Sequence, residues 1–234
     1  MGGVTTDADA ADAAEPVDHE GRTPLDRATA AFGDGRPVLI HDAADREGEI
    51  DLVYPARAVT PAALARMRND AGGLVCVALA DGIAEAWDLP FVQNSLDHPA
   101  AADHDLGYDE RSSFSLTVNH RDTYTGITDA DRALTVSELG RAAADFEEYD
   151  FPSAFRAPGH VHLLRGAPDG LADRRGHTEL GLTLAAAADL PPAVAVCEML
   201  VDAEGALSPT AARAYAERNG LVYVEGSSIV DRLG

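Results

Sequence analysis

Apolar residues along this chain follow two spacings in turn, one helical and one extended. Helices that open on a Thr-Pro or Ser-Pro pair and close on glycine are predicted from Thr23-Pro24 to Gly33, from Thr60-Pro61 to Gly72 and from Ser208-Pro209 to Gly220. A capping box at Thr135 and Glu138 predicts another helix, as does the pattern over 177–190. Short apolar runs predict strands at 37–41, 74–79, 114–118 and 193–200, and 151–166 predicts a turn followed by a short strand. The mixture, without an internal repeat, indicates one mixed α and β domain.

The first 21 residues differ in composition from the rest. They are small and acidic with no apolar periodicity, and such a segment cannot bury enough surface to order itself. We therefore expect a disordered acidic leader at 1–21 and a folded domain at 22–234. The sequence has no secretory signal pattern and no run of eighteen apolar residues, so we expect a cytoplasmic protein that does not contact a membrane.

The charge balance narrows the classes of partner. The chain has 40 acidic residues against 18 basic ones, all of them arginine, for a formal net charge of −22. Nucleic acid is therefore not expected as a partner, because duplex phosphate is bound through basic surface. The excess of acid and the absence of lysine are typical of proteins from a high-salt cytoplasm, and we infer a halophilic source.

The two cysteines, Cys76 and Cys197, both lie in apolar, strand-like runs. A free thiol that packs as a small apolar side chain is the expected state of each, and a disulfide is not expected.

An acidic segment, DREGEID at 45–51, is the first candidate for chemistry. Side chains alternate along an extended chain, so Glu47, Glu49 and Asp51 would point to one side if the segment were extended. Arg46 alone cannot neutralise three carboxylates, so a divalent metal or a substrate that exchanges protons with them would provide the compensation. A solvated acidic loop is the alternative, and it has weight in a chain this acidic.

A second candidate is the run RRGHTE at 174–179, where a helix is predicted to begin. Arg174 and Arg175 supply guanidinium groups, Gly176 lets a ligand approach the backbone, and Thr178 adds a hydroxyl in the first helical turn. This is a good anion site, although an ordinary capped helix after a basic turn has the same pattern. With Glu47, His177 could give one metal a nitrogen and an oxygen ligand.

Two further residues stand out by their surroundings. Glu198 lies in an otherwise apolar strand, and a carboxylate there is costly to desolvate unless it is paired or functional. The alternative is that the strand ends before Glu198, which is then solvated. His160 follows Pro158-Gly159 and is either catalytic or an ordinary turn histidine.

Several motifs, in order, make the chain from Thr23 to its last residue resemble the 3,4-dihydroxy-2-butanone 4-phosphate synthase family. The segments that carry the resemblance are DREGEID (45–51), RNDAGGLVC (68–76), TGITDADR (125–132), PGHV (158–161), RRGHTE (174–179) and CE (197–198). Ile50 replaces the glycine usual in the first motif, the stretch after Asn94 is longer and more acidic than expected, and Ala206-Leu207-Ser208 departs from the family's pattern.

The resemblance implies an α+β fold with three layers, in which helices flank a mixed, twisted sheet. It implies a homodimer with active sites at the interface, and the conversion of D-ribulose 5-phosphate to L-3,4-dihydroxy-2-butanone 4-phosphate and formate with Mg²⁺ or Mn²⁺, two ions per site. Carried over by position, the metal ligands are Glu47 and His177, and the proton-transfer residues are Asp51, Glu49, Glu198 and His160, with Asp51 taking the first proton and His160 reaching the partner's site. The substrate-binding residues are Arg46, Glu47, Asp51, Arg174, Arg175, Gly176, His177, Thr178 and Glu198.

Two other functions fit the same residues. A sugar-phosphate isomerase or aldolase uses similar enediolate chemistry but releases no formate. An inactive relative that binds metal or ligand as a scaffold is the second alternative, and the intact charged motifs argue against it.

Overall fold

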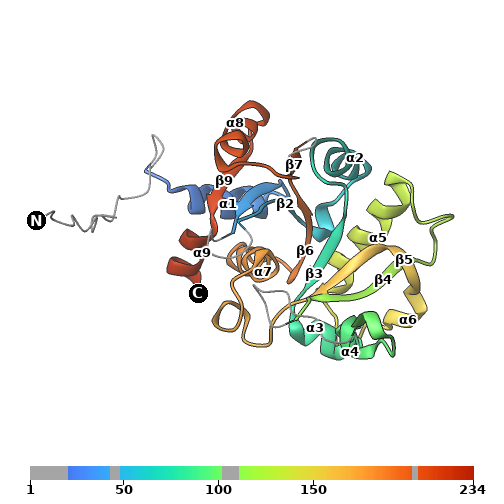
Figure 1. The fold of residues 1–234 in the computed structure, drawn as a ribbon. Helices are drawn as coiled ribbons and strands as arrows, with labels where there is room; N and C mark the ends of the chain where they lie inside the picture. Colours follow the sequence, from blue (N-terminus) through green and yellow to red (C-terminus); the bar gives the residue numbers. More distant parts are fainter. Residues whose placement is uncertain (1–20, 43–47, 102–110, 202–204) are drawn as a thin grey trace, which may run out of the picture.

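A seven-stranded sheet organises the chain in the computed structural model, which describes residues 21–42, 48–101, 111–201 and 205–234. The strand order is β4-β5-β3-β6-β2-β1-β9, with parallel pairing between β3 and β5 and between β1 and β9 and antiparallel pairing elsewhere. The strands are β1 (Val38–His41), β2 (Ile50–Pro55), β3 (Cys76–Leu79), β4 (Phe114–His120), β5 (Phe155–Arg165), β6 (Ala193–Glu198) and β9 (Val222–Glu225). A separate hairpin joins β7 (Leu200–Val201) to β8 (Gly205–Ala206). The predicted mixed sheet is confirmed (Figure 1).

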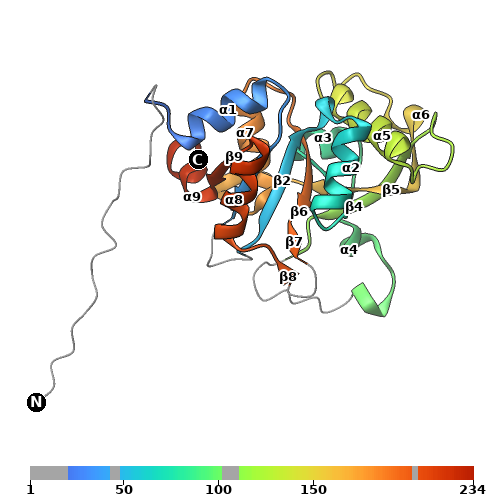
Figure 2. The same cartoon turned by 90° about the horizontal axis from the view of Figure 1, so that it is seen from above.

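Helices cover both faces of the sheet, and each face has its own apolar cluster. On one face lie α2 (Pro61–Asp70), α3 (Asp81–Ala86), α5 (Asp129–Ala142) and α8 (Pro209–Asn219). On the other lie α1 (Pro24–Gly33), α7 (His177–Ala187) and α9 (Gly226–Leu233), which gather at the β9 end (Figure 2). The remaining elements are α4 (Val92–Ser95), α6 (Phe151–Ala154) and three 3-10 turns at Ala56–Ala58, Pro99–Ala101 and Gly170–Ala172. The three-layer α+β class is therefore confirmed.

Local capping explains why several predicted helix ends are correct. The Thr23 hydroxyl accepts a hydrogen bond from the Asp26 N–H while the Asp26 carboxylate accepts from Thr23 N–H, which is a complete capping box. Thr60 and Ser208 cap α2 and α8 in the same way through their hydroxyls. Gly220 ends α8 in the left-handed region at φ 63°.

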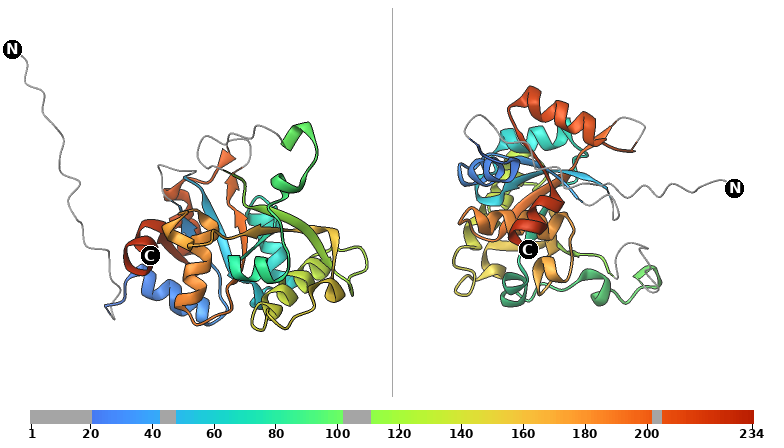
Figure 3. Two further views of the ribbon diagram at one scale, coloured as in Figure 1. Left: turned by 90° about the horizontal axis from the view of Figure 1, so that it is seen from below. Right: turned by 90° about the vertical axis from the view of Figure 1, so that its left-hand side faces the viewer.

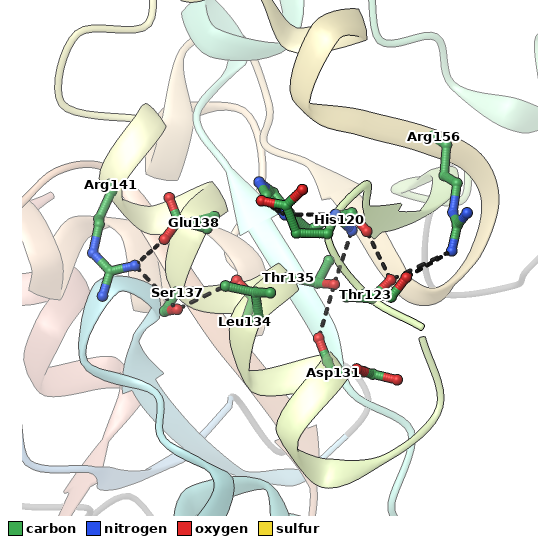
Figure 4. Close-up of polar contacts among 10 residues, drawn as sticks. His120, Thr123, Asp131, Leu134, Thr135, Ser137, Glu138, Arg141 and Arg156 are labelled. Carbon is green, nitrogen blue, oxygen red and sulfur yellow. Dashed lines mark hydrogen bonds and ion pairs between the residues drawn. The ribbon is translucent and has the colours of Figure 1, made fainter. Parts of the chain in front are cut away.

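The predicted start of the next helix at Thr135 is wrong. Helix α5 begins at Asp129, six residues earlier, where the Thr128 hydroxyl accepts a hydrogen bond from Asp131 N–H. Thr135 lies buried inside the helix, where its hydroxyl donates to the Asp131 carbonyl and accepts from His120 N–H (Figure 4). Glu138 forms an ion pair with Arg141 on the same helix and does not cap it (Figure 4).

Sequence patterns missed β2, β9 and α9 and gave β5 too short. Strand β2 starts inside the acidic segment, at Ile50. Strand β5 runs for 11 residues where a short strand was expected. The chain after Gly220 adds β9 and then α9, which packs beside α7 (Figure 3).

Three further expectations concerned the cysteines, membrane contact and the acidic leader. Cys76 and Cys197 are buried free thiols, as expected. None of the helices that the structure describes combines the length and the apolar character needed to cross a membrane. The expected acidic leader covers 1–21, of which 1–20 lie outside the described residues, so the leader stays a prediction.

Candidate active site

The centre of the site is a pair of carboxylates on neighbouring strands. Asp51 on β2 lies directly opposite Glu198 on β6 in the antiparallel register. Residues alternate between faces along a strand, and both carboxylates fall on the face of Val53, Val194 and Val196, which belong to the cluster under α1, α7 and α9. Asp51 is buried, whereas Glu198 is half-buried at the last position of its strand. The strand was predicted over 193–200 and ends two residues earlier, at Glu198 itself.

The first turn of α7 brings a histidine to this pair. Gly176 is the N-cap residue of α7, and His177 and Thr178 begin the helix, as predicted. His177 Nδ1 lies 3.8 Å from Asp51 Oδ2. Glu49, Asp51 and His177 each offer one potential ligand atom, and these atoms all lie within 4.8 Å of one another. Two carboxylate oxygens and an imidazole nitrogen suit a hard divalent cation, so these residues fit a metal site.

The same helix start carries groups suited to an anion. The Thr178 side chain is buried, and its hydroxyl has no hydrogen-bond partner in the described part of the chain. The N-terminal N–H groups of an α-helix of this length favour negative charge. Arg174 lines the adjoining cleft, and its Nη1 donates to Glu179 Oε2 at 3.0 Å. Arg175, by contrast, is exposed and does not line the cleft, so the structure does not bring its side chain to the other residues.

A cleft of about 1330 Å³ lies beside these residues, and Gly176 and Thr178, which are buried, are not part of its lining. Its floor comes from β2, β3, β5 and β6, and its far wall comes from β4 with α4 and the turn after α4. Glu49, Asp51, Arg174, His177 and Glu198 all line it. The opposite part of the lining is largely apolar, with Leu74, Leu96, Phe114, Leu116 and Leu164. A small polar substrate would therefore occupy only the charged end.

Among the lining residues that were not selected from the sequence as site residues, two have a shifted pKa. Burial raises the pKa of the Cys76 thiol to about 12, so this side chain is a neutral thiol in the cleft floor. Burial also lowers the pKa of the His162 imidazole, which packs edge-on against the Phe114 ring. Neither residue type carries a sequence signal that separates a cleft position from an ordinary strand position.

His160 lies elsewhere in this chain. It is exposed on β5 and is not part of the cleft lining. The buried Asn119 holds it, because Asn119 Oδ1 accepts from His160 N–H at 2.8 Å and Asn119 Nδ2 lies 3.1 Å from His160 Nδ1. Asn119 Oδ1 also lies 3.4 Å from His160 Nδ1, so the tautomer of the imidazole decides the direction of this side-chain contact.

A close approach at Gly126 supports Asn119. Gly126 has φ +85°, and a Cβ added there would lie 2.0 Å from Asn119 Nδ2. Asp131 fixes the turn, because its carboxylate accepts from Gly126 N–H at 2.9 Å and from Thr125 N–H at 3.2 Å. These bonds lower the pKa of Asp131, the Gly126 N–H foremost. Residues of the TGITDADR motif thus form the turn that packs against Asn119, which in turn contacts His160.

Arg46 and Glu47 lie outside the described residues, so their assigned roles remain predictions. The group that the described residues assemble contains His177, as predicted for the metal, together with Glu49 and Asp51, which the sequence assigned to proton transfer. Glu179 contacts Arg174, and Asn119 contacts His160. Neither residue was selected from the sequence, because these contacts are visible only in the fold.

Potential metal ligands, two facing carboxylates and a helix start suited to an anion lie together at one cleft, an arrangement that fits an enzyme site for a small, negatively charged substrate. The profile of the 3,4-dihydroxy-2-butanone 4-phosphate synthase family matches residues 26–232. The 3,4-dihydroxy-2-butanone 4-phosphate synthase of Archaeoglobus fulgidus is 47% identical over 215 residues, 86% of this chain and 90% of that protein. The enzyme of the same name from Methanosarcina mazei is 44% identical over 221 residues, 88% of this chain and 90% of that protein.

The fold comparison agrees. A crystal structure of 3,4-dihydroxy-2-butanone 4-phosphate synthase in complex with two magnesium ions superposes with a TM-score of 0.73 at 30% identity, over 87% of this chain and 93% of that one. The chain belongs to the 3,4-dihydroxy-2-butanone 4-phosphate synthase family. The expectation of an enzyme of this kind, acting in riboflavin biosynthesis, is confirmed.

Proposed function

We propose that the charged end of the cleft binds D-ribulose 5-phosphate and converts it to L-3,4-dihydroxy-2-butanone 4-phosphate and formate. One observation carries the proposal. Asp51 on β2, Glu198 on β6 and His177 at the start of α7 lie together in the cleft that Arg174 also lines. Proton-transfer groups and an anion site therefore lie within one substrate's reach.

The phosphate would bind at the start of α7. Arg174 would contribute its guanidinium, the Gly176 region its backbone, and Thr178 its hydroxyl, which is buried without a protein partner within the described ranges. A buried hydroxyl that lacks a partner costs free energy, and a phosphate oxygen would recover it. Arg175 would contribute only to the local positive charge, since its side chain is exposed and does not line the cleft.

The carboxylates would move the protons. Asp51 would take the first proton, from a carbon next to the ketone, because it is the buried member of the pair and lies beside His177. Glu198, directly opposite, would return a proton at a second carbon, and Glu49 would serve at the cleft edge. The five substrate carbons leave as a four-carbon phosphate and formate, so the reaction needs no external oxidant or reductant. Two facing acids suit a sequence with several proton transfers.

Mg²⁺ or Mn²⁺, two ions per site, would bind His177 together with acidic residues. The described candidates are Glu49 and Asp51, and Glu47 is the candidate from the family resemblance. When bound, the metal would stabilise the negative charge that develops on neighbouring substrate oxygens. His177 is held for this purpose by its place in the first turn of α7.

The active form would be a cytoplasmic homodimer. His160 is exposed and lies outside the cleft of its own chain, which supports a role in the partner's site. Its imidazole, held by Asn119, would transfer a proton there.

Formate release from D-ribulose 5-phosphate tests the proposal. The assay contains Mg²⁺ and high salt. Salt screens the repulsion among the excess acidic residues and so stabilises the folded chain. We expect formate that disappears with EDTA and in the Glu47→Gln variant. Consumption of the substrate without formate, by a folded protein, would support an isomerase or aldolase instead, and binding without turnover would support a scaffold.

A further inference from the structure

Glu179 is a buried carboxylate that no step above uses. It is the third residue of α7, and only 1% of it is exposed. Its Oε1 accepts from Ala167 N–H at 3.0 Å, and its Oε2 accepts from Arg174 Nη1 at 3.0 Å. The two oxygens therefore hold two different segments against the start of α7.

The burial of Glu179 makes this contact specific. A carboxylate so far from solvent must be paired, and the Arg174 guanidinium is its charged partner, with the side chain of Arg174 15% exposed. Ala167 directly follows Gly166, whose N–H donates to the Leu79 carbonyl at the end of β3, so the backbone that meets Oε1 is itself fixed to the sheet. Glu179 thus gives one edge of the guanidinium a defined position relative to the sheet.

A guanidinium presents its donors in a planar fork, so fixing one edge fixes the direction of the others. Arg174 lines the cleft at the helix start. We propose that Glu179 is a positioning residue that orients the Arg174 guanidinium toward the phosphate of the substrate. This inference rests on the proposed function, in which Arg174 binds that phosphate.

The proposal predicts a particular kinetic signature. Phosphate binding contributes equally to the substrate and to the transition state when it lies remote from the reacting carbons, so its loss raises KM and leaves kcat nearly unchanged. A purely structural role of Glu179 would instead lower the amount of folded enzyme without changing KM.

Glu179→Gln is the first variant, because it keeps the shape while its amide can no longer accept from both neighbours. We expect KM for D-ribulose 5-phosphate, and the inhibition constant of inorganic phosphate, to rise about tenfold, in line with the loss of a charged hydrogen bond, with kcat within about twofold. Glu217→Gln, on the exposed face of α8, is the matched control and should leave both constants unchanged. If Glu179→Gln does not fold, Glu179→Asp, which keeps the charge on a shorter side chain, is measured by the same criteria.

A double-mutant cycle with Arg174→Ala separates the inference from the proposed function. If Glu179 acts through Arg174, adding Glu179→Gln to Arg174→Ala should change the phosphate inhibition constant by less than about twofold. Full additivity, or unchanged constants in a folded Glu179 variant while Arg174→Ala raises them, would overturn the positioning role alone. If Arg174→Ala itself leaves them unchanged, the phosphate site of the proposed function is wrong, and the inference fails with it.

Discussion

Asp51 and Glu198 face each other across β2 and β6, as paired residues of one antiparallel ladder. Paired positions in such a ladder lie about 5 Å apart at Cα, so the sheet places two acids at the charged end of the cleft without any loop contributing. Neighbouring carboxylates repel, and this arrangement is costly unless a cation or a proton lies between them. We therefore expect the pair to serve function and not stability.

Replacing either acid should separate these two properties. We expect Asp51→Asn and Glu198→Gln each to lower the rate of formate release by about 10²–10⁴-fold, the usual range for a lost acid or base. The melting temperature should stay the same or rise, because a repulsion is removed. Formate kinetics and thermal unfolding on the same samples measure both, and a folded variant with full activity would remove that residue from the mechanism.

Asn119 should matter through His160. Asn119→Leu removes both contacts to His160 while keeping a side chain of similar size, and we expect formate release to fall about as far as in His160→Ala. The double variant should be no slower than the slower single variant, because both changes act on one group. Additive losses in formate kinetics would show that Asn119 has a separate function.

Gly126 should tolerate no side chain. Gly126→Ala places a Cβ 2.0 Å from Asn119 Nδ2, at φ +85°, a backbone region costly for alanine by about 1–3 kcal/mol. We expect a lower free energy of unfolding in chemical denaturation, together with reduced activity. Gly82→Ala is the control, since a Cβ there meets nothing within 4 Å, and it should be close to neutral. Equal stabilities of the two variants would mean that the turn adapts.

Metal binding should depend on the cluster at β2 and α7. We expect His177→Ala to weaken Mn²⁺ binding by at least about tenfold, the scale of a lost ligand or its support. Glu47→Gln, Glu49→Gln and Asp51→Asn, compared by calorimetric titration, would show which acid shares the ion with His177. The surface variant Glu217→Gln should titrate like the original protein. Unchanged affinity in His177→Ala would refute the site.

The two thiols should resist alkylation. Burial raises the pKa of Cys76 to about 12 and that of Cys197 to about 11, so at pH 8 neither is a thiolate in the folded protein. Folding favours the protonated thiols, and their contribution to stability is therefore complete below the ordinary thiol pKa of 9.0 and is lost as pH rises through about 11 and 12. Mass spectrometry after iodoacetamide treatment should find label only once the protein is unfolded. Rapid labelling of Cys76 in folded protein at pH 8 would contradict its burial.

Local signals predicted much of this fold, and the failures occur where distant contacts decide. The starts of α1, α2, α7 and α8 follow from residues within one turn, such as Thr23 with Asp26. Thr128 and Thr135 each precede an acid by three residues, so both resemble a helix start. His120, on β4, decides between them, because its N–H uses the Thr135 hydroxyl.

The site shows the same division. Glu198 and His177 both line the cleft, and they were selected because an acid in an apolar strand and a histidine at a helix start are visible locally. Glu179 resembles any acid in a first helical turn, and only its contact with Ala167 points to the positioning role proposed above. His160 was selected from its motif, yet it lies outside the cleft of its own chain. Sequence spacing alone does not predict this position.

The register between β2 and β6 also acts as a check on folding. If β2 slipped by one residue, Asp51 would turn toward the apolar cluster that holds Ile50 and Leu52, and Ile50 would enter the cleft. A chain with Asp51 misplaced would thus have a charge buried in its core and would not persist. Every molecule that folds stably has already aligned its two acids, so the enzyme needs no separate step to assemble them.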